Sequence, residues 1–306
     1  MDRHLGGGAR LSASRSLGRW LYAHPRGRLG LLLGPAVAWL LIFYVVALAI
    51  LLLTSLWRQD VFTAEILRDW NTDSYGKLLS GQDGLWLRVF GRTVLLAVIV
   101  TAVDIAIAFP LAWFMARVLP PRWRTLAFLA VVVPLWSSIL VRIFAWRTIL
   151  GGSGVLNTLL VDTGLLDQPS SAFLYNETAI VITWANVWLP FMVLPIFTAL
   201  EKIPDSTLEA ARDLGAGGWT TFRTVVFPLA LPGIVAGAIF VFALTMGDFV
   251  APQLVGGGSQ VLGGAIKDRF GVAADYPFGA ALASLTLVTL MGFLFLSRRS
   301  GALENL

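Results

Sequence analysis

The sequence predicts an all-α membrane protein that crosses the bilayer six times. Of its 306 residues, 57% are hydrophobic and only 13% are charged, whereas soluble domains average about 25% charged residues. Six apolar runs approach or exceed the length of about 20 residues that a helix needs to span the hydrocarbon core. They cover residues 29–57, 93–115, 126–146, 179–200, 229–250 and 279–296. Because the number of spans is even, both ends of the chain are expected on the cytoplasmic side.

The N-terminal third contains a tail, a first span and an external segment. Residues 1–28 are polar and carry six arginines with one acid, which is typical of a cytoplasmic tail. The run 29–57 is too long for the core of a cleavable signal peptide and ends without a small-residue cleavage site, so we expect it to be retained. Residues 58–92 mix five acids with basic residues and are expected outside.

Residues 93–300 hold the remaining five spans, and charge sets their orientation. The basic turn Pro120–Arg124 separates the second span from the third and is expected in the cytoplasm. Residues 147–177 contain a glycine-rich loop and a predicted short helix at 155–161, and they are expected outside. With this topology 14 Lys and Arg residues lie inside and 8 lie outside or at a boundary. The bias agrees with the positive-inside rule.

Residues 201–228 form a charged loop between the fourth and fifth spans. These 28 residues carry seven charges, so they must lie outside the bilayer. Ser206 and Glu209 have the spacing of a capping box, which predicts a helix over about 207–214. Three glycines follow, and a second helical segment is expected over 219–226, ending before Pro228. A helix, glycine elbow and second helix have a size that suits docking in a groove of another protein.

This loop resembles the signature of the membrane subunits of ABC importers, E-A-A-x3-G-x9-I-x-L-P. The matching residues are Glu209, Ala210, Ala211, Gly215 and Pro228, with Val225 in place of Ile and Phe227 in place of Leu. Glu and Ala are common helix formers, so the triplet alone would fit an ordinary amphipathic loop. Together with the glycine and proline at these separations, it identifies the chain as similar to that family. The resemblance implies the type I ABC importer permease fold and an ATPase-docking role for the loop.

Two further segments are similar to the spermidine and putrescine permease subunits. Residues 141–146 read VRIFAW and are followed by GGSGVLN at 151–157, and residues 247–257 read GDFVAPQLVGG. The resemblance covers the third to the sixth span, and it implies transport of a small cation, with polyamine as the expected solute. Relatives that carry other organic cations, aminophosphonates or opines share much of the pattern. Those solutes therefore stay open as alternatives.

The resemblance also implies partners and a mechanism. We expect a second homologous permease subunit, two ATP-binding subunits, an extracytoplasmic solute-binding protein and the lipid bilayer of the cell membrane as surroundings. ATP and Mg²⁺ would be held by the ATP-binding subunits, and this chain would carry no cofactor. Transport would proceed by alternating access.

Nothing in the sequence indicates an enzyme, a metal site or a nucleic-acid binder. The chain lacks G-x-x-x-x-G-K-[ST], G-x-S-x-G and H-E-x-x-H motifs. It has no Cys, and its two His residues lie near the N-terminus, so no metal ligand cluster is predicted. Its positive charge is spread over loops instead of forming one basic face. A membrane enzyme and a membrane assembly factor remain as alternatives, although two isolated Asp residues make a poor catalytic cluster.

Charged residues inside the spans are the candidate translocation-path residues. Asp104, Arg142 and Asp248 fall within apolar runs, where a charge facing lipid at the bilayer centre costs about 2.5–3.5 kcal/mol. They should therefore face protein or water. Trp146, from the polyamine-like segment, completes the set. Asp104 and Arg142 could pair with each other or with another subunit, or they could line the path; Asp248 could meet the solute.

Overall fold

The computed structural model describes residues 25–60 and 63–299 and divides into two units, residues 1–54 and 55–306. The described part of the first unit is helix α2, Pro25–Thr54, with Pro35 inside it. This helix confirms the first predicted span and ends three residues earlier than expected. Residues 1–24 of the predicted tail lie outside the described residues.

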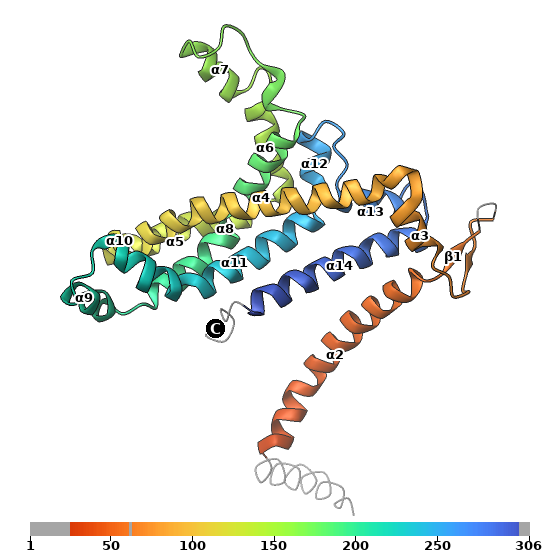
Figure 1. Ribbon diagram of the computed structural model, residues 1–306, viewed down its shortest axis with the longest axis horizontal. Helices are drawn as coiled ribbons and strands as arrows, with labels where there is room; N and C mark the ends of the chain where they lie inside the picture. The colour runs from red at the N-terminus through yellow and green to blue at the C-terminus, as the bar shows by residue number, and fades with distance from the viewer. Residues whose placement is uncertain (1–24, 61–62, 300–306) are drawn as a thin grey trace, which may run out of the picture. The chain divides into compact units, whose positions relative to one another are not determined.

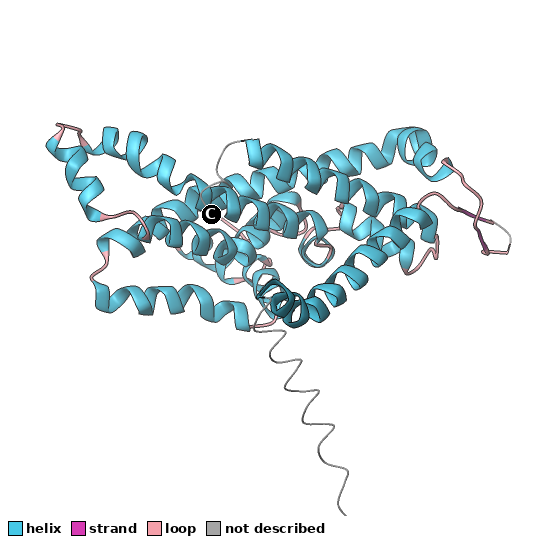
Figure 2. Ribbon diagram, turned by 90° about the horizontal axis from the view of Figure 1, so that it is seen from below, coloured by secondary structure: helices cyan, strands magenta, loops and turns pink. Residues whose placement is uncertain are grey.

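The second unit is almost entirely helical, as Figures 1 and 2 show. It opens with a two-stranded antiparallel hairpin, in which Arg58 lies opposite Leu67 and Gln59 opposite Ile66. The elements in order are β1 Arg58–Gln59, β2 Ile66–Leu67, α3 Asp73–Ser80, η1 Gly81–Gly84, α4 Leu85–Trp113, η2 Phe114–Val118, α5 Pro121–Val132, η3 Val133–Trp136, α6 Ile139–Leu150, α7 Val155–Asp162, η4 Ser171–Phe173, α8 Glu177–Glu201, α9 Asp205–Asp213, α10 Gly218–Thr221, η5 Phe222–Val226, α11 Phe227–Gly247, α12 Val250–Val255, α13 Leu262–Phe270 and α14 Tyr276–Arg299.

Helices α4, α8 and α11 pack together to form the centre of this unit (Figure 1). Small residues let α11 approach α8 closely: a Cβ on Gly233 would lie 2.5 Å from the carbonyl oxygen of Pro195, and one on Gly237 would lie 2.6 Å from the sulfur of Met192. Close approach through small residues is the usual basis of helix packing in membranes. The buried core includes Val100, Ile180, Trp184, Met192, Ile196 and Val241.

The described residues contain six helical stretches that are long and apolar enough to cross a membrane, which confirms the predicted number. The fourth, fifth and sixth predicted spans correspond to α8, α11 and α14 within a few residues. The short helix expected over 155–161 is confirmed as α7.

The second span begins at Leu85, eight residues before the predicted start. Arg88 and Arg92 interrupt the apolar pattern there, so residues 85–92 were expected to belong to the external segment. The structure extends the helix through them because Arg92 forms an ion pair of 2.8 Å with Glu177, at the start of α8. A paired charge at the end of a span does not face lipid alone.

The prediction of the third span is wrong, because residues 126–146 do not form one helix. Helix α5 gives way to a 3-10 turn that contains Pro134, and Ser137 and Ser138 are extended, with ψ of 150° and 135°. Proline lacks the N–H that continues a helix. Helix α6 then runs in a different direction from α5 (Figure 1). The corresponding spanning candidate is residues 139–162, which joins α6 and α7 through the turn at 151–154.

Candidate functional site

The loop between α8 and α11 contains a first helix, α9, that begins at Asp205. The predicted capping box is wrong: the N-cap residue is Pro204, no side chain caps the helix, and the N–H of Thr207 donates to the carbonyl oxygen of Pro204 at 3.1 Å. Proline fixes its own φ and sets the helix start two residues earlier than the serine would. Asp205 in the first turn suits the positive end of the helix dipole.

Gly215 ends this helix in a left-handed conformation, with φ of +80°. Its N–H donates to the carbonyl oxygen of Arg212 at 2.8 Å, and the N–H of Ala216 donates to that of Ala211 at 3.0 Å. This pair of hydrogen bonds is the Schellman motif, in which glycine is favoured because it has no Cβ. Gly217, by contrast, has an ordinary φ of −67°.

The second helix of the loop continues into the fifth span without a break. The prediction that it ends before Pro228 is wrong, because α10, the π turn η5 and α11 follow one another directly over residues 218–247. In the π turn the N–H of Phe227 donates to the carbonyl oxygen of Phe222, five residues back. This wider turn accommodates Pro228, which has no N–H for the usual helical bond. Pro228 also borders an apolar groove of about 690 Å³ beside α8.

The elbow of this loop exposes large apolar side chains that the sequence reading missed. Leu214 is 88% exposed and Trp219 is 72% exposed, one on each side of the glycines. Glu209 is also exposed, on α9. A surface that combines exposed apolar anchors with charged neighbours is typical of a protein contact. The signal in the sequence was a leucine and a tryptophan next to glycines in a loop with no core of its own.

Arg142 and Trp146 lie one turn apart on α6 and both reach α8. Arg142 donates from Nη1 to the carbonyl oxygen of Val187 at 3.0 Å, and Trp146 donates from Nε1 to Oδ1 of Asn186 at 2.8 Å. Arg142 also lines a cavity of about 220 Å³. Its other lining residues come from α4, α5, η3 and α8, and are Leu111, Ala130, Val131, Pro134, Asn186, Leu189, Pro190 and Val193.

Asp248 accepts hydrogen bonds from a neighbouring helix end and from α8. Its Oδ1 accepts from the N–H of Val250 at 3.0 Å, and its Oδ2 accepts from the N–H of Ala251 at 3.2 Å and from Nε1 of Trp184 at 2.6 Å. Asp248 lies two residues before α12, and its carboxylate accepts from the first two N–H groups of that helix, which have no partner within the helix. The carboxylate therefore anchors α12 to α8 at Trp184. Arg142 contacts α8 three residues later, at Val187. Trp184 and Asn186 are functional candidates that the sequence reading did not single out.

Asp104 stands apart from the other three path candidates. Its side chain, on α4, is fully buried, and neither carboxylate oxygen has a hydrogen-bond partner among the residues that the structure describes. Among the ion pairs of the described residues, neither Asp104 nor Arg142 appears, so the pairing considered between them is wrong. A buried polar group without a partner is costly, and where one persists it points to a functional role or a missing partner.

Comparison with known proteins identifies the class to which this fold and loop belong. Residues 108–301 match the family model described as "Binding-protein-dependent transport system inner membrane component". This is more than half of the chain, and the chain belongs to that family. It is a multi-pass inner-membrane subunit of an ABC importer.

Relatives with curated descriptions agree over most of the length. The chain is 35% identical over 287 residues to the inner membrane ABC transporter permease protein YdcU of Escherichia coli (strain K12), covering 90% of each chain. It is 36% identical over 262 residues to the spermidine/putrescine transport system permease protein PotB of Salmonella typhimurium (strain SL1344), covering 85% of this chain and 88% of that one.

A solved structure shows the same fold. The chain resembles a chain of the bacterial alginate ABC transporter in complex with an alginate pentasaccharide-bound periplasmic protein, with a TM-score of 0.68 and 18% identity, over 94% of this chain and 96% of that chain. The type I importer permease fold expected from the sequence is therefore confirmed.

Proposed function

We propose that this permease subunit carries a polyamine, or a chemically similar small organic cation, into the cell. The observation that carries this proposal is the 36% identity to a spermidine/putrescine permease over 85% of the chain. The buried carboxylate of Asp104 supports it, because an acid without a protein partner inside a span can lower the cost of moving ammonium groups through the membrane. The relative YdcU is named only as an inner membrane ABC transporter permease, so another small solute stays as the second candidate.

The chain works as one part of an assembly. Its partners are a second related permease subunit, two ATP-binding subunits that hold ATP and Mg²⁺, and an extracytoplasmic binding protein. The presence of a periplasmic protein in the alginate transporter complex supports the last of these. Both termini and the loop between α8 and α11 face the cytoplasm, where ATP is available. The chain itself performs no chemistry, and its role is to convert movement of the ATP-binding subunits into opening of a path.

The geometry of the loop supports a direct mechanical connection to two packed spans. Helix α8 ends at Glu201, four residues before α9 begins, and the other side of the elbow is helical without a break into α11. A displacement of the elbow by an ATPase therefore acts on α8 and α11 together. Because those helices pack closely at Gly233 and Gly237, they move as one body. Alternating access follows from rocking of this body against the second permease.

Affinity purification of the tagged chain with its proposed partners tests the assembly. We expect one second permease and two ATP-binding subunits to remain bound in detergent. Charge reversal at exposed Glu209 with Glu209→Lys should lower the amount of ATP-binding subunit recovered, because the charge lies in the proposed contact. Recovery of the chain without any ATP-binding subunit would contradict the proposed function.

A further inference from the structure

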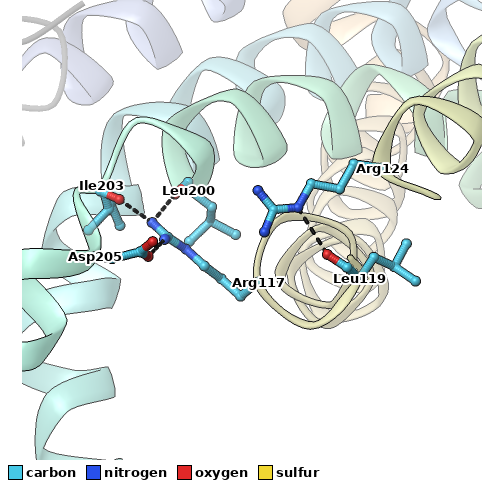
Figure 3. Close-up of polar contacts among 6 residues, drawn as sticks. All are labelled: Arg117, Leu119, Arg124, Leu200, Ile203 and Asp205. Atoms are coloured by element: carbon cyan, nitrogen blue, oxygen red, sulfur yellow. Dashed lines mark hydrogen bonds and ion pairs between the residues drawn. The ribbon is translucent and has the colours of Figure 1, made fainter. Parts of the chain in front are cut away.

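Arg117 lies four residues beyond α4, in a turn that continues the same helical stretch, and it contacts the segment between α8 and α9. It belongs to the π turn η2, and its guanidinium group reaches across to the loop that follows α8. Nη1 donates to Oδ1 of Asp205 at 2.7 Å, and Nη2 donates to the carbonyl oxygens of Leu200 and Ile203, both at 2.5 Å (Figure 3). The side chain of Arg117 is only 12% exposed, although that of Asp205 is 84% exposed.

The acceptors explain why this position holds an arginine. Leu200 lies in the last turn of α8 and Ile203 lies two residues beyond its end, so both carbonyl oxygens are near the negative end of the helix dipole. Asp205 is the first residue of α9. A planar guanidinium group can serve several acceptors at once, whereas the ammonium group of lysine is a compact point charge. One side chain thus holds the end of α8 and the start of α9 against α4.

The far side of the same loop also contacts α4. Phe222, in the π turn before α11, packs edge-to-face on Phe109 of α4, with ring centroids 5.6 Å apart. Helix α4 therefore contacts the segments on both sides of the elbow, although it is not adjacent to the loop in sequence. The apolar contact can slide at little cost, while the contact of Arg117 is directional and charged.

We propose that Arg117 is a positioning residue that locks α9 to α4, so that displacement of the loop moves α4 together with α8. The inference rests on the proposed function, in which an ATPase displaces that loop. With Arg117 in place, the span that carries Asp104 follows α9 during the transport cycle. When the tie is lost, ATP hydrolysis continues and α4 follows incompletely.

Arg124 provides a matched control. It has the same side chain, it lies in the first turn of α5, and its Nε donates to the carbonyl oxygen of Leu119 at 3.0 Å, just before that helix (Figure 3). That bond stays within the turn and does not reach α8 or α9. Arg117→Lys and Arg124→Lys both keep the positive charge, so the two variants differ in which contact they weaken. Asp205→Asn weakens the bond to α9 and leaves both carbonyl bonds of Arg117 intact.

The first test measures ATP hydrolysed per molecule of labelled spermidine taken up by the reconstituted importer. We expect Arg117→Lys and Asp205→Asn to raise this ratio about fivefold, a coupling change at the low end of the usual range, while Arg124→Lys leaves it unchanged. An unchanged ratio in Asp205→Asn, or an equal rise in Arg124→Lys, would overturn the proposal. If Arg117→Lys does not assemble, Asp205→Asn decides.

The second test does not depend on the solute. The chain has no Cys, so spin labels can be placed through Val118→Cys and Asp213→Cys, at exposed positions beyond α4 and at the end of α9. We expect the distance between the labels to stay constant on ATP binding in the parent complex and to change in Arg117→Lys. A distance that changes equally in both would overturn the proposal, whereas failure of the chain to bind any ATPase would contradict the proposed function instead.

Discussion

Replacing Gly215 with valine should uncouple transport from ATP hydrolysis, and the structure indicates how large the effect is. The residue has φ of +80°, and a Cβ built on it would meet nothing within 4 Å. The cost is therefore one of backbone conformation and not of steric overlap with a neighbour. A left-handed conformation costs an L-residue roughly 1–2 kcal/mol. A difference of 1.4 kcal/mol corresponds to a factor of about ten in an equilibrium constant. The equilibrium constant between the native elbow and its other conformations should therefore fall about tenfold.

The assay is ATP-driven uptake and ATP hydrolysis by the reconstituted complex, with the amount of chain in the membrane measured in parallel. We expect Gly215→Val to insert normally and to lose up to about tenfold in uptake, which is the limit set by the change in the equilibrium constant of the elbow. Gly215→Asn should retain most activity, because asparagine tolerates the left-handed region. Gly217→Ser adds a side chain to the same elbow at an ordinary φ of −67° and should have little effect. Uptake and stimulated hydrolysis at the parent level in Gly215→Val would show that transport does not need the left-handed elbow.

Three further predictions concern the packing of the spans and the path. Gly233→Ala places a Cβ 2.7 Å from that of Ala199 and should lower thermal stability by about 1–3 kcal/mol; an unchanged melting temperature would contradict the close contact of α8 and α11. Asp248→Asn should lower both the melting temperature and uptake, because it weakens charge-assisted bonds worth about 1.5–3 kcal/mol each. Trp184→Phe keeps the two backbone bonds of Asp248 and should lower the melting temperature and uptake less. Uptake at the parent level in Asp248→Asn would show that transport does not need this carboxylate. Asp104→Asn should lower polyamine uptake without lowering the melting temperature, since the carboxylate has no partner to lose; unchanged uptake would exclude Asp104 from the path.

The helices were predictable where the sequence carried a local signal. Long apolar runs sufficed for α8, α11 and α14, because span length follows from bilayer thickness. The third span failed because hydropathy averages over Pro134 and two serines, which redirect the chain without reducing its apolar character. The early start of α4 could not be predicted either, because it depends on the ion pair between Arg92 and Glu177, which lies 85 residues later in the sequence.

The loop between α8 and α11 could also be predicted only in part. The left-handed glycine could be predicted, because helix ends commonly need one. The capping box failed, since Pro204 sets the start of α9 before Ser206 can act as a cap.

The roles of the charged residues could not be predicted, because they depend on contacts between elements far apart in sequence. Asp248 bonds to Trp184, and Arg117 bonds to Asp205. No local pattern in the sequence records either pair.

Uptake by proteoliposomes identifies the solute that the importer carries. The chain, its second permease, the ATP-binding subunits and the loaded binding protein would be reconstituted, with ATP or ADP supplied on the side of the ATP-binding subunits. We predict accumulation of labelled spermidine that requires ATP and is reduced by excess unlabelled putrescine. ATP-dependent accumulation of a different solute, with no uptake of spermidine or putrescine, would contradict the assignment of polyamine as the cargo.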